Sequence, residues 1–291
     1  MGKYFMINYS VIIPHYNDVE SLKKCLSTIP IRNDIEIIVV NDGLKEETEK
    51  LSIEINSDNR DCLYIYANEG TLLSAGACRN TGIKHAIGKW LVFSDADDYF
   101  TDDAFETMDI YLDDKADIIF FESDSINYPS LAQGDRHRHL NRLIDGYIDG
   151  KYSEDVLKYG WRSPCAKMVK LNMVNRYNIC FDEIRFANDI LFSVMTGHYA
   201  SRIAVCNRVI YIIVKKDNTL TTNISPENFK CRLDVFIAKY LFVKDKVKRS
   251  ELPTIMGGRP FWRIINGFRN YGLGMSRYVI KKFAENGVCL W

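Results

Sequence analysis

Apolar runs alternate with amphipathic segments through roughly the first 120 residues, and this alternation restricts the fold more than any other feature. The runs are short, rich in β-branched residues and bounded by polar residues, which is typical of buried strands. Strands are expected at residues 9–14, 35–40, 62–67, 90–94 and 116–121, and helices at residues 19–28, 45–55, 71–87 and 102–112. This order predicts an α/β fold with an open, mostly parallel sheet and flanking helices.

Composition sets the broad class of the protein. The apolar and charged fractions are those of a soluble globular protein, and the 38 basic and 38 acidic residues cancel. Eight cysteines are scattered singly without a C-x-x-C pair, which favours free thiols in a reducing compartment over zinc or disulfides. The sequence lacks a recognisable signal peptide and an apolar stretch of membrane-spanning length. We therefore expect a cytoplasmic protein. The whole-chain charge argues neither for nor against a nucleic-acid partner, and none is expected.

Polar residues follow three of the expected strands, at the point where each strand ends. These are His15–Asp18, Asn41–Asp42 and the carboxylates of Asp95, Asp97 and Asp98. Ligands of open α/β sheets bind outside the carboxyl ends of the strands, so these residues predict one crevice. An isolated D-x-D-D is more often a surface turn, because Asp favours turns and helix caps. Three carboxylates within four residues are also suited to a cation.

Two common phosphate-binding loops are missing from the sequence. The first strand ends in P-H-Y-N-D, without the glycines of a dinucleotide-binding or Walker loop. A phosphate would therefore be met by a metal ion and basic side chains. Arg79 lies on an expected helix near the acidic cluster, where it could offset charge or grip a phosphate. Gly76 and Gly82 flank it, and each indicates a close approach by backbone or ligand.

Four segments together resemble family 2 glycosyltransferases in order and in spacing. They are Val11–Asn17 (VIIPHYN), Val39–Gly43 (VVNDG), Ala77–Gly82 (ACRNTG) and Asp95–Asp98 (DADD). The resemblance covers roughly the first two thirds of the chain and implies a GT-A fold. It also implies a nucleotide-sugar donor, with a UDP-sugar expected, a divalent metal (Mn²⁺ or Mg²⁺) and inversion at the anomeric carbon.

The resemblance also implies roles for individual donor-site residues. The first loop, with Pro14, Tyr16 and Asn17, would border the nucleotide base. Asp42 would accept a hydrogen bond from the base, and Arg79 would lie beside the base and the phosphates.

The acidic motif would hold the sugar nucleotide by its ribose and its diphosphate. Asp95 would face the ribose, and Asp97, helped by Asp98, would bind the metal. In the family, a Glu-Asp pair opens a later helix and its aspartate acts as the base. This chain has Asn188-Asp189, so Asp189 is the expected base, although an ordinary helix cap is the alternative reading.

The middle of the chain carries weaker signals. Residues 127–142 are polar and are expected to form a loop over the crevice. Trp161 and Lys167 match positions that lead to the acceptor side in the family, although Trp161 could equally be a core residue. Lys215, Lys216, Asn218 and Thr221 form either a loop over the donor phosphates or a plain surface turn. Residues 1–125 are expected to bind the donor and residues 126–224 the acceptor.

The C-terminal region, residues 225–291, is expected to be helical. Its basic residues are interleaved with aromatic ones, notably between residues 252 and 291. Such a pattern favours an anionic membrane surface as a partner, with packing on the catalytic domain or stacking on RNA as alternatives. A peripheral location on the inner face of the plasma membrane would follow.

The sequence therefore predicts an inverting, metal-dependent glycosyltransferase that extends a glycan or lipid-linked acceptor in surface polysaccharide synthesis. Two alternatives remain open. One is a sugar-nucleotide-binding protein that has lost catalysis, which Asn188 motivates. The other is a nucleotidyltransferase, which the missing glycine-rich loop after the first strand disfavours.

Overall fold

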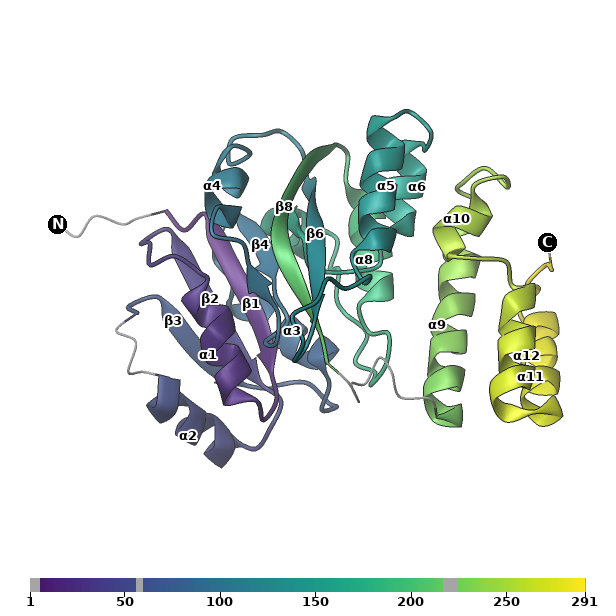
Figure 1. The fold of residues 1–291 in the computed structure, drawn as a ribbon, viewed down its shortest axis with the longest axis horizontal. Coiled ribbons are helices and arrows are strands. Elements are labelled where there is room, and N and C mark those ends of the chain that lie inside the picture. Colours follow the sequence, from purple (N-terminus) through teal and green to yellow (C-terminus); the bar gives the residue numbers. More distant parts are fainter. Residues whose placement is uncertain (1–5, 56–59, 217–224, 291) are drawn as a thin grey trace.

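The computed structural model describes residues 6–55, 60–216 and 225–290. One mixed sheet forms its centre, with helices around it and further helices at the C-terminal end (Figure 1). The strands are β1 (Tyr9–His15), β2 (Ile35–Asn41), β3 (Leu63–Ala67), β4 (Trp90–Phe93), β5 (Tyr99–Phe100), β6 (Ile118–Asn127), β7 (Lys167–Lys170) and β8 (Ile203–Lys215). The predicted α/β class is confirmed.

The sheet has the order β3-β2-β1-β4-β7-β6-β8-β5. The first four strands in this order are parallel, while β7 is antiparallel to both β4 and β6. β6 and β8 are parallel, and β5 pairs with β8 in the antiparallel sense. The parallel half of the sheet is thus the part that the sequence predicts. The strand order reverses between β1 and β4, and open α/β sheets bind ligands at such a point.

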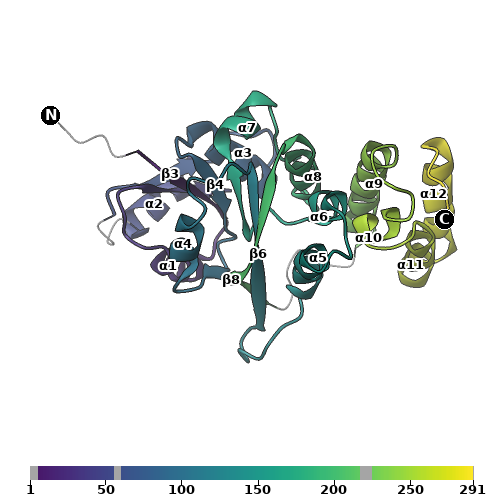
Figure 2. The same cartoon turned by 90° about the horizontal axis from the view of Figure 1, so that it is seen from above.

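Helices cover both faces of the parallel half (Figure 2). They are α1 (Val19–Ser27), α2 (Lys45–Ile55), α3 (Ala75–His85) and α4 (Ala104–Asp109). Ile12 of β1 faces α3 and Tyr9 faces Phe105 of α4, because strand side chains alternate between the two faces. The strands read as continuous apolar runs because both faces are buried.

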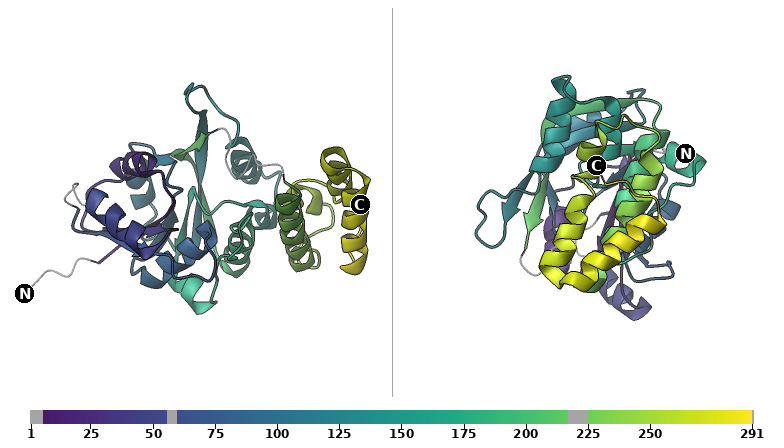
Figure 3. Two further views of the ribbon diagram at one scale, coloured as in Figure 1. Left: turned by 90° about the horizontal axis from the view of Figure 1, so that it is seen from below. Right: turned by 90° about the vertical axis from the view of Figure 1, so that its right-hand side faces the viewer.

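The remaining helices belong to the middle and the C-terminal part of the chain. They are α5 (Arg138–Ile148), α6 (Glu154–Gly160), α7 (Leu171–Arg176), α8 (Ile190–Tyr199), α9 (Pro226–Val243), α10 (Leu252–Met256), α11 (Phe261–Tyr271) and α12 (Leu273–Glu285). α9 packs on α8 and α10 packs on α6, while α11 and α12 form a hairpin at the far end (Figure 3). Apolar residues of α10 and α12 join the same core as the sheet.

The expected loop over residues 127–142 is only partly correct. β6 continues to Asn127, and α5 begins at Arg138. α5 has one buried apolar stripe, formed by Leu140, Leu143 and Ile144. The many polar residues of the segment make this stripe hard to recognise in the sequence. The predicted boundary at residue 224 stays a prediction, since residues 217–224, with Asn218 and Thr221, lie outside the described residues.

Glycine allows α3 to pack tightly at two positions. A β-carbon at Gly82 would lie 2.5 Å from Cγ2 of Ile12, and one at Gly76 would clash with the backbone oxygen of Asp182. It would also lie 3.0 Å from Cβ of Asn188. The close approach that the two glycines predict is therefore confirmed, with protein rather than ligand as the neighbour.

Gly76→Ala is expected to destabilise the fold by about 1–3 kcal/mol, because the added methyl group must displace backbone. Gly274→Ala in α12 is the matched control, since nothing lies within 4 Å of its β-carbon position. The control should be neutral or should gain at most about 1 kcal/mol from helix propensity. Urea unfolding of both variants measures the difference, and equal midpoints would refute the packing argument.

Candidate active site

The carboxyl ends of β1, β2 and β4 meet at one edge of the sheet. His15 Nδ1 lies 3.1 Å from Oδ1 of Asn41, and the amide of Asp42 donates to the carbonyl of His15 at 2.7 Å. The amide of Ser94, at the start of the acidic turn, donates to the carbonyl of Ile12 at 3.1 Å. The structure therefore brings together the three polar strand ends that the sequence places in one crevice.

The loop after β1 forms the rim of this edge. Tyr16 is 65% exposed, and Asn17 adopts φ +61°, a left-handed conformation that Asn tolerates well. Pro14 is half-buried at the end of β1. Asp42 accepts a hydrogen bond from Nδ2 of Asn68 at 2.8 Å, which fixes its carboxylate beside the end of β3.

Lys216 directly follows β8 and contacts the segment between β1 and α1. Its Nζ lies 2.7 Å from Oδ2 of Asp18 and 2.8 Å from Oγ of Ser21. The hydrogen bond from Lys216 lowers the pKa of Asp18 to about 2. Lys216, one of the basic residues expected near the donor phosphates, therefore lies beside the loop after β1. Burial raises the pKa of Asp97, and the charge of Lys216 opposes part of that rise.

Asp98 is held by β8 and faces the protein interior. Its Oδ2 accepts from the hydroxyl of Tyr211 at 2.9 Å and its Oδ1 from the amide of Val214 at 2.7 Å. Burial, followed by the charges of Asp95 and Asp97, raises its pKa well above the ordinary value. Both oxygens of Asp98 thus bond to β8, and its expected role as a helper in metal binding stays a prediction.

Asp95 and Asp97 are the carboxylates left for a cation. The side chain of Asp95 is 45% exposed, and burial followed by the charge of Asp95 raises the pKa of Asp97. No cation lies within salt-bridge distance of Asp97 among the described residues. Nowhere in the described part of the chain are three His, Cys, Asp or Glu side chains placed to hold a metal ion together. One or two carboxylates completed by substrate phosphates are the usual Mg²⁺ arrangement, so the residues present fit a metal that arrives with a diphosphate.

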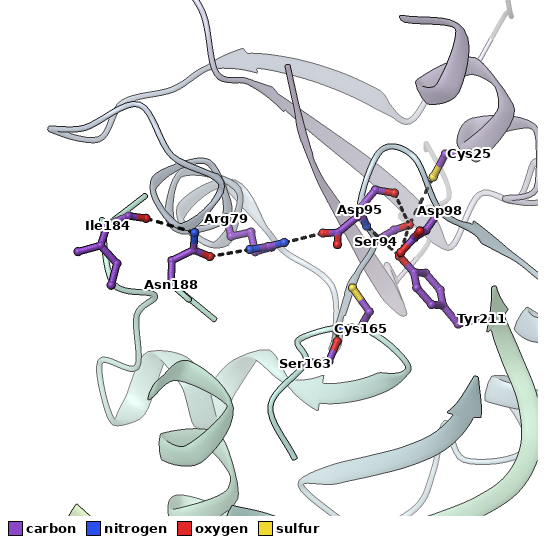
Figure 4. A network of polar contacts seen from close by, with 10 residues as sticks. All are labelled: Cys25, Arg79, Ser94, Asp95, Asp98, Ser163, Cys165, Ile184, Asn188 and Tyr211. Carbon is purple, nitrogen blue, oxygen red and sulfur yellow. Dashed lines mark hydrogen bonds and ion pairs between the residues drawn. The ribbon is translucent and has the colours of Figure 1, made fainter. Parts of the chain in front are cut away.

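Arg79 connects the acidic turn to the segment before α8 (Figure 4). Its Nη2 donates to Oδ1 of Asp95 at 2.5 Å, and its Nη1 donates to Oδ1 of Asn188 at 3.1 Å. Burial opposes its charge, but Asp95 and neighbouring anions raise its pKa above the ordinary value. Arg79 is buried and bonded on both sides, so its guanidinium holds Asp95 and Asn188 together, and its expected place beside the phosphates stays a prediction.

Asp189 immediately precedes α8, next to the residue that Arg79 holds. Its side chain makes no capping hydrogen bond, so the ordinary cap reading is not supported. Burial is the largest cause that raises its pKa, and Arg79 acts in the opposite direction. A partly desolvated carboxylate at this place has the properties of a general base. Asn188 stands where the glutamate of the expected Glu-Asp pair would be, and its amide oxygen accepts a hydrogen bond from Arg79.

Trp161 and Lys167 do not line an acceptor surface. Trp161 is fully buried with its ring 5.0 Å from that of Phe120, so the core reading of this residue is correct. Lys167 is 1% exposed, and its Nζ donates to Oγ of Ser193 in α8 at 3.2 Å. Burial lowers the pKa of Lys167 to about 7, and its charge acts on Asp189 from inside the protein.

Tyr211 is a site residue that the sequence did not reveal. Its hydroxyl accepts from the amide of Asp95 at 2.9 Å as well as donating to Asp98. The two partners lie more than 110 positions away along the chain, so no local pattern could indicate the contact.

Comparison with known proteins decides the family. The family model described as "Glycosyl transferase family 2" matches residues 10–176, which is more than half of the chain. The chain belongs to this family. The matched region contains all four motifs and every residue of the acidic turn, while Asp189 and the C-terminal helices lie beyond it.

Curated relatives of this family 2 glycosyltransferase include bacterial proteins. The chain is 27% identical over 234 residues to "Uncharacterized glycosyltransferase EpsJ" of Bacillus subtilis (strain 168), covering 73% of the chain and 62% of the relative. It is 23% identical over 233 residues to "Poly(ribitol-phosphate) beta-N-acetylglucosaminyltransferase TarS" of Staphylococcus aureus (strain MW2), covering 77% of the chain and 39% of TarS. The chain thus spans less than two thirds of the length of both relatives.

Solved structures confirm the GT-A fold and its helical C-terminal part. The crystal structure of S. aureus TarS 1–349 superposes with a TM-score of 0.67 at 20% identity, covering 90% of this chain and 74% of that chain. The same fragment in complex with UDP-GlcNAc gives a TM-score of 0.63 at 18% identity, covering 96% and 89%. The mannosyltransferase PcManGT from Pyrobaculum calidifontis, in complex with GDP-Man and Mn²⁺, gives 0.55 at 16% identity, covering 98% and 77%.

Proposed function

We propose that the chain transfers a sugar from a UDP-sugar to a hydroxyl group of a glycan or lipid-linked acceptor in surface polysaccharide synthesis, with inversion at the anomeric carbon. The observation that carries the proposal is the bridge through Arg79, which holds Asp95 on one side and Asn188, next to Asp189, on the other. The bridge supports a donor side at Asp95 and an acceptor side at Asp189.

The donor side consists of the rim loop, Asp42, Asp95 and Asp97. Tyr16 is exposed and free to stack on a nucleotide base, and Asp42 is oriented by Asn68 to accept from the base. Asp97 would hold the divalent metal, with Asp95 beside it. When bound, Mn²⁺ or Mg²⁺ would neutralise the charge of the departing diphosphate. The UDP and UDP-GlcNAc complexes of TarS and the Mn²⁺ complex of PcManGT support this choice of donor and metal.

The acceptor side supplies the base. As the acceptor hydroxyl attacks, its proton passes to Oδ of Asp189, and the sugar is attacked from the face opposite the diphosphate. A single carboxylate at this place is what a direct displacement with inversion requires. Asp98, Tyr211 and Arg79 take no part in proton transfer and hold the acidic turn in position.

A panel of nucleotide sugars, with Mn²⁺ or with EDTA, tests the proposal by thermal shift. One or more UDP-sugars should raise the unfolding temperature in Mn²⁺ and should do so much less in EDTA. A panel in which no nucleotide sugar shifts the transition would contradict the proposal. A response to nucleoside triphosphates alone would favour the nucleotidyltransferase alternative.

We also propose that the chain acts on the cytoplasmic side, at the inner face of the plasma membrane. No described helix is both long and apolar enough to cross a bilayer. α12 buries Met275, Val279 and Phe283 against the rest of the protein, as the packing alternative expects. α11, however, leaves three aromatic side chains about half exposed: Phe261, Trp262 and Phe268. Arg259 and Arg269 are exposed near them, which suits an interfacial helix.

Flotation with phosphatidylglycerol vesicles tests this location. We expect the intact chain to float and the double variant Phe261→Glu/Phe268→Glu to remain in the dense fraction, because the apolar edge would carry two charges. Ile53→Glu, at a similarly exposed apolar residue of α2, is the control and should float like the intact chain. Equal flotation of all three proteins would refute the membrane contact.

A further inference from the structure

A cavity lies where the C-terminal helices meet the start of α8, and none of the donor-edge residues lines it. It measures about 170 Å³ and is lined by side chains from three parts of the chain. Arg162 comes from the segment after α6, Ala187 and Ile190 flank the start of α8, and the remaining wall comes from α9, α10 and α11. The family model ends before α8, so apart from Arg162 the residues that line this cavity lie beyond the matched region.

Four cations face the cavity, and we call it the cationic pocket. They are Arg162, Arg232 and Lys239 of α9, and Arg263 of α11. None of the four forms an ion pair with a carboxylate within the part of the chain that the structure describes. An arrangement of this kind is costly, because like charges are being brought together in a partly desolvated place.

The directions of the pKa shifts of Arg162, Lys239 and Arg263 agree with their geometry. Burial and then Arg263 lower the pKa of Arg162, and burial and then Arg162 lower the pKa of Lys239 well below its ordinary value. Burial and then Arg232 lower the pKa of Arg263. Each cation therefore interacts unfavourably with another cation of the same pocket. A bound anion would relieve all of these interactions at once.

Local structure holds the cations in place despite their repulsion. Gly257 ends α10 with φ +67°, and any side chain there would clash with the guanidinium of Arg162. Nζ of Lys239 donates to the carbonyl of Ile255 at 2.8 Å. The guanidinium of Arg263 lies 4.8 Å from the ring centre of Phe236. The fold thus builds the pocket from defined contacts, and these are not surface side chains that happen to lie close together.

The pocket adjoins the proposed base. Ala187 and Ile190, which line it, lie on either side of Asp189 in the sequence, and the charge of Asp189 acts on Arg162. Ala187 has φ +58°, so the backbone turns sharply where the pocket meets the start of α8. A group bound in the pocket would therefore belong to the molecule that presents its hydroxyl to Asp189.

We propose that the cationic pocket binds a phosphate group of the acceptor, so that the accepted hydroxyl belongs to a sugar or polyol carrying a phosphate nearby. This inference rests on the proposed function for its reading of Asp189. A pocket of this volume is smaller than the roughly 300–1,000 Å³ that a whole small molecule occupies, so it suits one group of a larger ligand. Three guanidinium groups favour a phosphate, which accepts bidentate hydrogen bonds from Arg and carries enough charge to balance several cations.

Thermal unfolding with sodium phosphate or with sodium chloride at equal ionic strength, in EDTA, tests the pocket. Phosphate should raise the unfolding temperature of the intact chain. Arg232→Gln and Arg263→Gln should each weaken phosphate binding by about tenfold or more. Each should also raise the unfolding temperature in chloride, because one repelling charge is gone. Arg249→Gln, at an exposed arginine between α9 and α10, should behave like the intact chain.

Two results would overturn the proposal. One is an equal phosphate response in the intact chain and in both pocket variants. The other is a lower unfolding temperature in chloride for both variants, which would show that the cations only support the structure. Competition distinguishes the source of the phosphate: a soluble poly(glycerol phosphate) should compete with inorganic phosphate, whereas competition by phosphatidylglycerol vesicles alone would assign the pocket to a lipid headgroup and overturn the acceptor reading.

The UDP-sugar panel on the intact chain separates this inference from the proposed function. A donor response without a phosphate response would remove the cationic pocket and leave glycosyl transfer standing. A phosphate response without any donor response would leave an anion site and remove its assignment to an acceptor.

Discussion

Replacing Asp189 with Asn is expected to lower the turnover of the UDP-sugar by about 10²–10⁴-fold, the usual contribution of a general base. The substitution keeps the size of the side chain and removes the group that takes the proton. Donor binding should change little, because the donor side is formed by the rim loop, Asp42, Asp95 and Asp97. Hydrolysis of UDP-GlcNAc in Mn²⁺, followed by release of UDP, provides the rate even before an acceptor is identified.

Asp182→Asn is the matched control for this experiment. Asp182 is half-buried in the same segment before α8, and burial raises its pKa as it does that of Asp189. The control should retain the rate of the intact chain. Equal rates for the intact chain and Asp189→Asn would remove the base assignment and favour a protein that binds a sugar nucleotide without catalysis.

The pH profile gives a second readout of Asp189. A base acts when deprotonated, so the rate should fall as the pH falls through its pKa. Burial raises that pKa above the ordinary value of 3.8, so the acidic limb should lie at higher pH than for an exposed aspartate.

Asp97→Ala is expected to weaken metal-dependent donor binding by about 100-fold or more, since one of at most two protein carboxylates for the metal is lost. Without metal, the variant should be no less stable than the intact chain, because the charge of Asp95 and burial both oppose ionisation of Asp97. Titration calorimetry of UDP with Mn²⁺ measures the first effect, and thermal unfolding in EDTA measures the second.

Asp102→Ala is the control for Asp97→Ala. Asp102 is an exposed acid four residues beyond the acidic turn and should have no effect on donor binding. Undiminished affinity of Asp97→Ala for UDP in Mn²⁺ would refute the metal site at this turn.

The sequence predicted the parallel half of the sheet because buried parallel strands carry continuous apolar runs, as β1, β2 and β4 do. It did not predict β7, whose four residues begin and end with lysine. It also did not predict β5, which is two residues long and exists through its pairing with β8. Such elements depend on partners distant in the sequence, which local periodicity does not report.

The same limit applies to the candidate site. The strand ends could be placed together because the topology of an α/β sheet dictates it. Asp98 bonds to Tyr211 and Val214, and Arg79 bonds to Asn188. The partners in each of these pairs lie more than 100 positions apart in the chain. Trp161 and Lys167 were misplaced on the acceptor side because a local motif says nothing of whether a side chain faces the crevice or the core.

The anomeric configuration of the first product tests the central claim most directly. Proton NMR of the sugar released from α-linked UDP-GlcNAc, recorded before mutarotation, or of the linkage formed with an acceptor, distinguishes the two outcomes. Attack from the face opposite the diphosphate, with Asp189 as the only base, predicts the β-anomer. Formation of the α-anomer would contradict direct displacement and, with it, the proposed placement of diphosphate and base on opposite faces of the sugar.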